Sequence, residues 1–334
     1  MKSTKRWVVT SGAVLITMAM TACNSESPST TASTGGSSGT AAAKSFTIGL
    51  ANQQESVTFP AAIAKGAKAK AAALGIKVVD LDSQGDQAKQ ASQVQDLIAQ
   101  KVDGIILVPL SPGPAQALVD QAAAANIPIG TAHGYVGADR TAENPYAKLK
   151  FVITEDEIGA GATAGDMAVK ALSGGGKVAV ITGAAGFIEN TNRVTKFKAA
   201  LDAKGGYTIV ATQPGNWTKQ DGQSACQNIL AATPDVGLFY AISDDMAVGC
   251  AAAVKSAGSK AKIIGIGGSA TGIAAIKSGE VYGTVCYKPE DEGASAVQAM
   301  YDVLTGKLTG APKTNFYDTP GVTKDNVDSC TPQW

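Results

Sequence analysis

The stretch FTIGLANQQESVTFPAAIAKGAKAKAAALGIKVVDLD, residues 46–82, decides the fold of this chain. Its first apolar run, FTIGLA, has the length of a buried strand, and the polar loop NQQESVTF follows it. An Ala- and Lys-rich run from Pro60 to Leu74 has helical spacing and stops at Gly75, and IKVVDLD supplies a second strand. This order predicts a parallel sheet, with a ligand loop at the carboxyl end of the first strand.

The same alternation of strands and helices runs through the rest of the chain. About five such units precede Thr154 and about five follow it, and residues 315–330 are predicted as an extended return. With 334 residues, 45% of them apolar and 17% charged, the chain is long enough for two lobes of the α/β class. The whole chain has a net charge of zero, which gives no indication of a nucleic-acid partner or an anionic membrane surface.

The first 45 residues are predicted as an export signal followed by a tether. A basic start, MKSTKR, precedes an apolar run that is too short for a membrane span, so residues 1–22 are predicted as a signal peptide. MTAC, at Met20–Cys23, resembles a bacterial lipobox and implies lipidation of Cys23; the alternative is an ordinary secretory signal with a chance cysteine. Residues 23–45 are rich in Ser, Thr, Gly and Ala and are predicted as a flexible tether with a mean reach of roughly 25 Å. We therefore expect an exported protein that is lipid-anchored to the outer face of the cell membrane.

Four further cysteines suggest disulfides in an exported protein, with three possible pairings. Cys226 and Cys250 fall near the starts of consecutive predicted helices, whereas Cys286 ends a late strand and Cys330 lies in the final segment. The pairs Cys226–Cys250 and Cys286–Cys330 are favoured on this ground, and free buried thiols are the alternative. Neither the cysteine spacing nor the single histidine suits a zinc site, and no cofactor is expected.

Several phrases in order, among them VVDLDSQGDQAKQASQVQDLIAQKVDGIILVP, ATQPGNWTKQDGQSACQNILAATPDV and ISDDMAVGCAAAVKSAG, resemble the ribose-binding-protein branch of periplasmic sugar-binding proteins. The resemblance covers residues 46 to about 327. It implies two Rossmann-like lobes with parallel sheets and three crossover strands, near Thr154–Glu155, Cys286–Tyr287 and Asp318–Thr319. The implied lobes are residues 46–154 plus 288–318 and residues 155–287 plus 319–334.

The resemblance also implies that two aromatic side chains stack on a sugar ring, one from each lobe. Phe59, in the first loop, and Trp217, in PGNWTKQ, match these positions and are expected to face each other across a closing cleft. A core phenylalanine at a helix start is the alternative reading of Phe59. Pro60 stands where the family has another aromatic residue, so one wall of the site is altered.

The polar positions of the family site are only partly kept in this chain. His133-Gly134 replaces an Asp-Arg pair, Thr191 replaces a sugar-binding arginine and Gly267 replaces an aspartate. An ordinary aldopyranose is therefore less secure as ligand than the family implies, and a smaller polyol, an inositol, a modified sugar or another small polar metabolite fits as well. Arg193 could turn toward the ligand or pair structurally with a carboxylate. The remaining polar candidates are Gln53, Glu155, Asn190, Ser243 in place of an asparagine and Tyr287 in place of a hinge glutamine.

The resemblance implies a solute-binding lipoprotein of an ABC importer, which captures a small sugar or polyol by hinge closure and works with a membrane permease. We expect a monomer that contacts the membrane only through its lipid anchor. A ligand-sensing co-receptor with the same fold is the alternative. The one G-x-S-x-G match, residues 35–39, falls in the predicted tether and not after a strand, and the chain lacks G-x-x-x-x-G-K-[ST]; both points argue against an enzyme. The export signal stands where a repressor would carry a DNA-binding helix-turn-helix.

Overall fold

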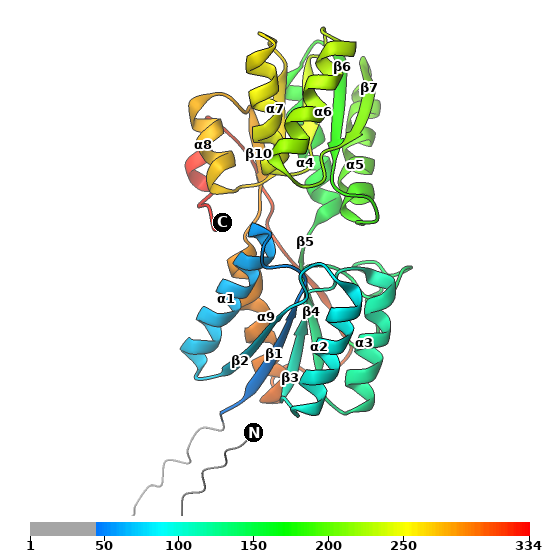
Figure 1. The fold of residues 1–334 in the computed structure, drawn as a ribbon, viewed down its shortest axis with the longest axis vertical. Coiled ribbons are helices and arrows are strands. Elements are labelled where there is room, and N and C mark those ends of the chain that lie inside the picture. The colour runs from blue at the N-terminus through cyan, green and yellow to red at the C-terminus, as the bar shows by residue number, and fades with distance from the viewer. Residues whose placement is uncertain (1–44) are drawn as a thin grey trace, which may run out of the picture. The chain divides into compact units, whose positions relative to one another are not determined.

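The computed structural model describes residues 45–334, so the predicted signal peptide, Cys23 and the tether up to residue 44 lie outside the described residues. Within residues 45–334, no helix has both the length and the apolar character that a membrane crossing requires. These residues form two α/β lobes, each built on a six-stranded sheet flanked by helices (Figure 1). The α/β class predicted from the strand–helix alternation is therefore confirmed.

The first lobe is built on a sheet with the strand order β11-β5-β4-β3-β1-β2, in which neighbouring strands run parallel. Its strands are β1 (Thr47–Asn52), β2 (Lys77–Asp82), β3 (Gly104–Leu107), β4 (Ile129–Ala132), β5 (Val152–Glu155) and β11 (Thr314–Tyr317). Its helices are α1 (Thr58–Leu74), α2 (Gln87–Ala99), α3 (Pro112–Ala124) and α9 (Pro289–Leu304). Two apolar clusters fill this lobe, one beneath α1 and α9 and the other beneath α2 and α3.

The second lobe has the strand order β12-β10-β9-β8-β6-β7, in which only β12 runs antiparallel to its neighbour. Its strands are β6 (Gly176–Thr182), β7 (Tyr207–Pro214), β8 (Leu238–Ala241), β9 (Lys262–Gly267), β10 (Gly283–Cys286) and β12 (Gly321–Thr323). Its helices are α4 (Glu157–Ala171), α5 (Glu189–Lys204), α6 (Lys219–Ala232), α7 (Asp244–Ser256) and α8 (Ala270–Ser278), with the short 3₁₀ helix η1 (Val327–Ser329).

The chain passes between the two sheets three times. It leaves the first sheet after β5, returns from β10 to α9, and leaves again between β11 and β12 (Figure 1). The expected crossover points Thr154–Glu155 and Cys286–Tyr287 lie at the ends of β5 and β10, and Asp318–Thr319 lies between β11 and β12. Three connections of this kind allow a hinge movement in which neither lobe has to unfold.

Local sequence signals explain where the first elements begin and end. Helix α1 ends at Gly75, whose φ of 67° is left-handed and suits glycine. Helix α2 begins after Asp86, whose carboxylate accepts hydrogen bonds from the backbone N–H groups of Ala88 and Lys89. All four residues of β3 are buried, as expected for a parallel strand that is covered by helices on both faces.

Helix α9 comes from the far end of the sequence and packs closely on α1. A Cβ atom on Gly66 would lie 1.9 Å from the backbone oxygen of Glu290, and one on Gly293 would lie 2.0 Å from that of Ile63. Glycine at both positions lets the two backbones approach, which fixes the start of α9 beside the first lobe's ligand loop.

Two disulfides lie in the second lobe, and they match the pairing favoured from the sequence. Cys226–Cys250 joins α6 to α7, with a Cα–Cα distance of 5.3 Å. Cys286–Cys330 joins the end of β10 to the segment after η1, with a Cα–Cα distance of 5.9 Å. The second bridge therefore holds the last residues of the sequence beside a crossover connection.

Candidate functional site

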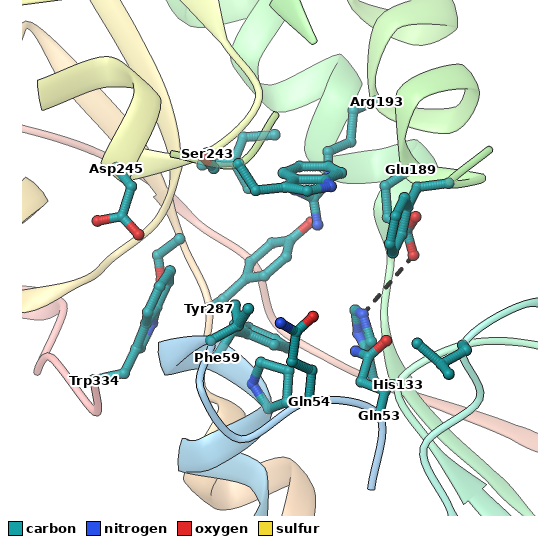
Figure 2. A pocket seen from close by; sticks show the side chains of 17 residues that line it. Gln53, Gln54, Phe59, His133, Glu189, Arg193, Ser243, Asp245, Tyr287 and Trp334 are labelled. Atoms are coloured by element: carbon teal, nitrogen blue, oxygen red, sulfur yellow. Dashed lines mark hydrogen bonds and ion pairs between the residues drawn. The ribbon is translucent and has the colours of Figure 1, made fainter. Parts of the chain in front are cut away.

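A cavity of about 130 Å³ lies where the carboxyl ends of the strands from both lobes come together. Figure 2 shows side chains of both lobes pointing into it. The first lobe contributes polar and aromatic side chains from its ligand loop and from the end of β4: Gln53, Gln54, Phe59 and His133. The second lobe contributes Glu189, Arg193, Trp217, Ser243 and Asp245, and the crossover after β10 contributes Tyr287. The site therefore mixes aromatic faces with groups that can form hydrogen bonds.

Seven of the nine residues expected from the sequence to bind ligand line this cavity: Gln53, Phe59, His133, Arg193, Trp217, Ser243 and Tyr287. The other two, Glu155 and Asn190, are not among its lining residues. Asn190 accepts a hydrogen bond from the backbone N–H of Gly183 at 2.8 Å and donates one to the oxygen of Ala184 at 2.6 Å. Its amide thus shapes the loop between β6 and α5 and is already used within the protein.

Glu155 lies behind the cavity wall and pairs with His133. Its carboxylate is fully buried, and its Oε1 atom lies 2.7 Å from His133 Nδ1, although this contact lacks the geometry of a hydrogen bond. Burial lowers the pKa of His133, but Glu155 and two further carboxylates outweigh burial and raise that pKa to about 10. His133 is therefore cationic at neutral pH, and its Nε2 atom lies 3.8 Å from Glu189 Oε1 of the other lobe (Figure 2).

Arg193 both lines the cavity and pairs structurally, so the two roles considered for it are combined. Its Nε and Nη2 atoms both donate to the carboxylate of Glu157, and its Nη1 atom donates to the backbone oxygen of Ile242 at 2.6 Å. The guanidinium also lies over the rings of Trp217 and Tyr287, at 5.8 and 5.2 Å from their centroids. This buried cation holds two of the cavity's aromatic rings in place.

The Glu157 carboxylate is the shared acceptor of this network. The hydroxyl of Tyr287 donates to Glu157 Oε2 at 2.8 Å, beside the bond from Arg193. Burial raises the pKa of Glu157 to about 7, and the Arg193 charge opposes that rise. The pair therefore fixes Tyr287, at a crossover between the lobes, to the first turn of α4.

Trp217 has a backbone conformation that is unusual for a bulky residue. Its φ is 64° and that of Asn216 is 50°, both in the left-handed region where glycine is favoured. The indole lies over Gly183, where a Cβ atom would approach the ring to 1.9 Å. The buried Nε1–H of Trp217 has no hydrogen-bond partner among residues 45–334. A strained aromatic residue with an unused donor at a cavity wall is typical of a ligand contact.

Phe59, which was expected to face Trp217 across the cleft, contacts Trp334. The rings of Phe59 and Trp334 meet edge to face, with centroids 5.5 Å apart, and Phe59 also contacts His133 and Tyr287. Trp217 contacts Phe187 edge to face at 5.7 Å. Phe59 and Trp217 both line the cavity, but Trp334 supplies a further wall that the sequence reasoning missed.

The structure also separates two neighbouring aspartates after β8. Asp245 lines the cavity and was not predicted, whereas Asp244 is buried and accepts hydrogen bonds from Ser269 N–H and the Thr284 hydroxyl. Ser243 lines the cavity and also accepts a long hydrogen bond, 3.4 Å, from Met246 N–H at the start of α7. The sequence S-D-D at a strand end indicates a helix cap, but it does not show which aspartate faces the cavity. The path of the backbone into α7 decides that.

One group of side chains in the described range, His133, Glu155 and Glu292, could hold a metal ion, with ligand atoms within 4.8 Å of one another. Burial, with the nearby Glu155 carboxylate, raises the pKa of Glu292 well above its usual range. Glu292 lies beside the His133–Glu155 pair, and the three side chains form one compact cluster. The site as a whole offers stacking faces, donors and acceptors, and it is arranged for binding.

Comparison with known proteins agrees with this description. The family model described as "Periplasmic binding protein domain" matches residues 48–308. The ribose import binding protein of Bacillus subtilis (strain 168) is 31% identical over 264 residues, which cover 79% of this chain and 83% of that protein. The xylitol-binding protein of Mycolicibacterium smegmatis is 30% identical over 266 residues, which cover 79% and 73% of the two chains. The crystal structure of an ABC transporter solute-binding protein from Mycobacterium smegmatis with bound glycerol is 28% identical, with a TM-score of 0.76 and coverage of 86% and 96%.

Proposed function

The chain belongs to the periplasmic binding protein family, and we propose that it captures a small sugar, polyol or related polar metabolite and delivers it to an ABC importer. This family binds solutes and is not enzymatic. The cavity between the two lobes carries the proposal, because it combines aromatic walls with fixed polar groups from both sheets. A ligand held in this way favours closure of the hinge, since it gains contacts with each lobe only when they approach.

The residues divide the work of recognition between stacking and hydrogen bonding. The rings of Phe59 and Trp217 offer flat apolar faces to the C–H surface of a sugar or polyol. The unused Nε1–H of Trp217 and the carboxylates of Glu189 and Asp245 offer a donor and acceptors for hydroxyl groups. The cationic His133 adds a second donor from the opposite lobe.

The size of the cavity favours a small ligand. Its volume of about 130 Å³ is well below the roughly 300–1,000 Å³ of sites for drug-sized molecules. A single monosaccharide, a short polyol or an inositol therefore suits it better than an oligosaccharide. The names of the related proteins include ribose, xylitol and glycerol as ligands, which supports this size class.

Location and partners follow from the same proposal. An importer's solute-binding protein works outside the cytoplasm, and lipidation of Cys23 would keep it at the outer face of the membrane, with residues 23–45 as tether. The protein partner is the importer's permease, which would receive the closed, ligand-bound form. We propose that the binding protein works as a monomer, because the cavity is complete within one chain.

A thermal-unfolding screen of the purified protein with sugars, polyols and inositols tests this function. A ligand present at a hundred times its Kd adds about 2.7 kcal/mol of stability, which corresponds to a rise in Tm of roughly 5 °C. We expect at least one small polyhydroxylated compound to produce such a rise. A flat response across the whole screen would refute the proposed ligand class.

A further inference from the structure

Residues 330–334 are fixed to both lobes by their own contacts. Cys330 is bonded to Cys286 at the end of β10, and the backbone oxygen of Trp334 accepts a hydrogen bond from Ala270 N–H, at the start of α8, at 2.7 Å. Gln333 Oε1 accepts from the N–H groups of Glu290 and Asp291, at 2.8 and 3.2 Å, at the start of α9 in the first lobe. This segment is therefore a strap that crosses from the second lobe to the first.

The strap carries the Trp334 indole into the cavity wall. Its Nε1–H donates to the backbone oxygen of Gly267 at 3.3 Å, so the ring's polar atom is turned toward β9. The ring meets Phe59 edge to face with an interplanar angle of 89°, and both rings line the cavity (Figure 2). The indole thus presents carbon to the ligand and keeps no free donor for it.

Two glycines at the end of β9 make room for the strap. A Cβ atom on Gly267 would lie 2.6 Å from Trp334 Cζ2, and one on Gly268 would lie 2.6 Å from Cys330 Sγ. Any side chain at position 267 that reached for a ligand hydroxyl would therefore collide with the indole. The Trp334 ring fits because position 267 is a glycine, and together the two residues leave this side of the cavity apolar.

We propose that residues 330–334 act as a disulfide-held strap whose Trp334 indole selects ligands with a C–H-rich face, such as a deoxy or methyl position, at that wall. A hydroxyl group placed against the indole would lose its bonds to water and find no partner there. A deoxy position has no hydroxyl group whose hydrogen bonds to water would be lost, and it gains contact with the ring. The inference rests on the proposed function, because it names the class of ligand that the same cavity takes.

Isothermal titration calorimetry of the purified protein with matched pairs of sugars tests this selection, because it gives the Kd of each member of a pair. The probes are D-galactose with its 6-deoxy analogue D-fucose, and D-ribose with 2-deoxy-D-ribose. In at least one pair, the wild type is expected to bind the deoxy member at least tenfold more tightly. Trp334→Ala is expected to reduce that ratio below threefold, and Trp334→Phe to keep part of it. Phe316→Ala, which removes a half-exposed ring outside the cavity, serves as the control and should leave the ratio unchanged.

The two disulfides offer a second, matched comparison that does not alter Trp334. Replacing Cys286 and Cys330 together by serine frees the strap and should lower the deoxy preference as Trp334→Ala does. Replacing Cys226 and Cys250 together by serine removes a bridge between α6 and α7 and should preserve the preference. Circular dichroism of each variant verifies that it is folded before the titration.

The outcomes separate the strap from the wider function. If the wild type binds sugars or polyols but prefers neither deoxy member, or if Trp334→Ala leaves the preference intact, the strap inference is wrong and the proposed function stands. If the wild type binds no sugar, polyol or inositol at all, both are wrong. Loss of the preference in Trp334→Ala and in the Cys286/Cys330 variant, with both controls unchanged, supports the inference.

Discussion

Replacing Gly183 with alanine tests whether the Trp217 ring forms a working wall of the cavity. Gly183 follows β6 directly, and a Cβ atom there would lie 1.9 Å from Trp217 Cζ2, whereas ordinary contact begins near 3.4 Å. The ring must therefore move by about 1.5 Å to restore normal contact. Gly183 does not have a positive φ, so alanine fits its backbone and the indole takes up the change.

That displacement should weaken ligand binding more than it weakens the fold. Overpacking of this kind costs roughly 1–3 kcal/mol of folding stability, which a protein of this size tolerates. The displaced ring no longer stacks on the ligand, and its Nε1–H no longer points at a ligand hydroxyl. We therefore expect the Kd of the best sugar or polyol to rise at least about tenfold, which is a loss of about 1.4 kcal/mol of binding free energy. Isothermal titration gives the Kd, and urea unfolding gives the stability.

Gly113→Ala is the matched control, since a Cβ atom at Gly113 has nothing within 4 Å. Its Kd should equal that of the wild type. If Gly183→Ala also binds with unchanged affinity while remaining folded, Trp217 is not a wall of the binding site and the assignment of the cavity is wrong.

Three further predictions concern stability. Arg193→Met leaves Glu157 buried without its partner and should lower the free energy of unfolding in urea by about 3–5 kcal/mol. A second change, Glu157→Gln, should restore much of that stability, and no recovery would contradict the pairing. Burial raises the pKa of Asp244 from 3.8 to about 6, so stability should fall as pH rises through that range, and Asp244→Asn should flatten this slope in urea midpoints. Removing the Cys226–Cys250 bridge, which closes a separation of 24 residues, should cost about 3.5 kcal/mol; a loss below about 1 kcal/mol would contradict the loop-entropy reasoning.

The helices and strands and their order could be predicted from the sequence, because each is marked by a local pattern of apolar, polar and glycine residues. The apolar run at 46–51, the helical spacing after Pro60 and the stop at Gly75 place β1 and α1 within a few residues of their observed bounds. The positions of two cysteines in consecutive helices were enough to favour one pairing. The loop after the first strand was expected to bind ligand, because parallel strands bring their carboxyl ends to one edge, and the family resemblance indicated Phe59 and Trp217.

The contacts that complete the site depend on chain segments that meet only in space. Trp334 reaches the cavity after the chain has crossed between the sheets three times, and no local pattern reports where that segment returns. Gly267 stands where the family has an aspartate, so the sequence indicated that a polar side chain is missing there. Only the structure shows that the Trp334 indole occupies its place. Glu155 likewise pairs with His133 because β4 and β5 are neighbours, which diverts a predicted ligand group into the hinge.

Intrinsic tryptophan fluorescence tests the central claim, which is that one small ligand binds between the lobes. Both tryptophans in the described part of the chain, Trp217 and Trp334, line the cavity. Titration with a compound that raises Tm should therefore change the emission saturably, with one equivalent at the endpoint, and the double variant Trp217→Phe/Trp334→Phe should lose the signal. A compound that raises Tm but leaves the emission of both tryptophans unchanged would contradict the account, because its binding site would lie elsewhere.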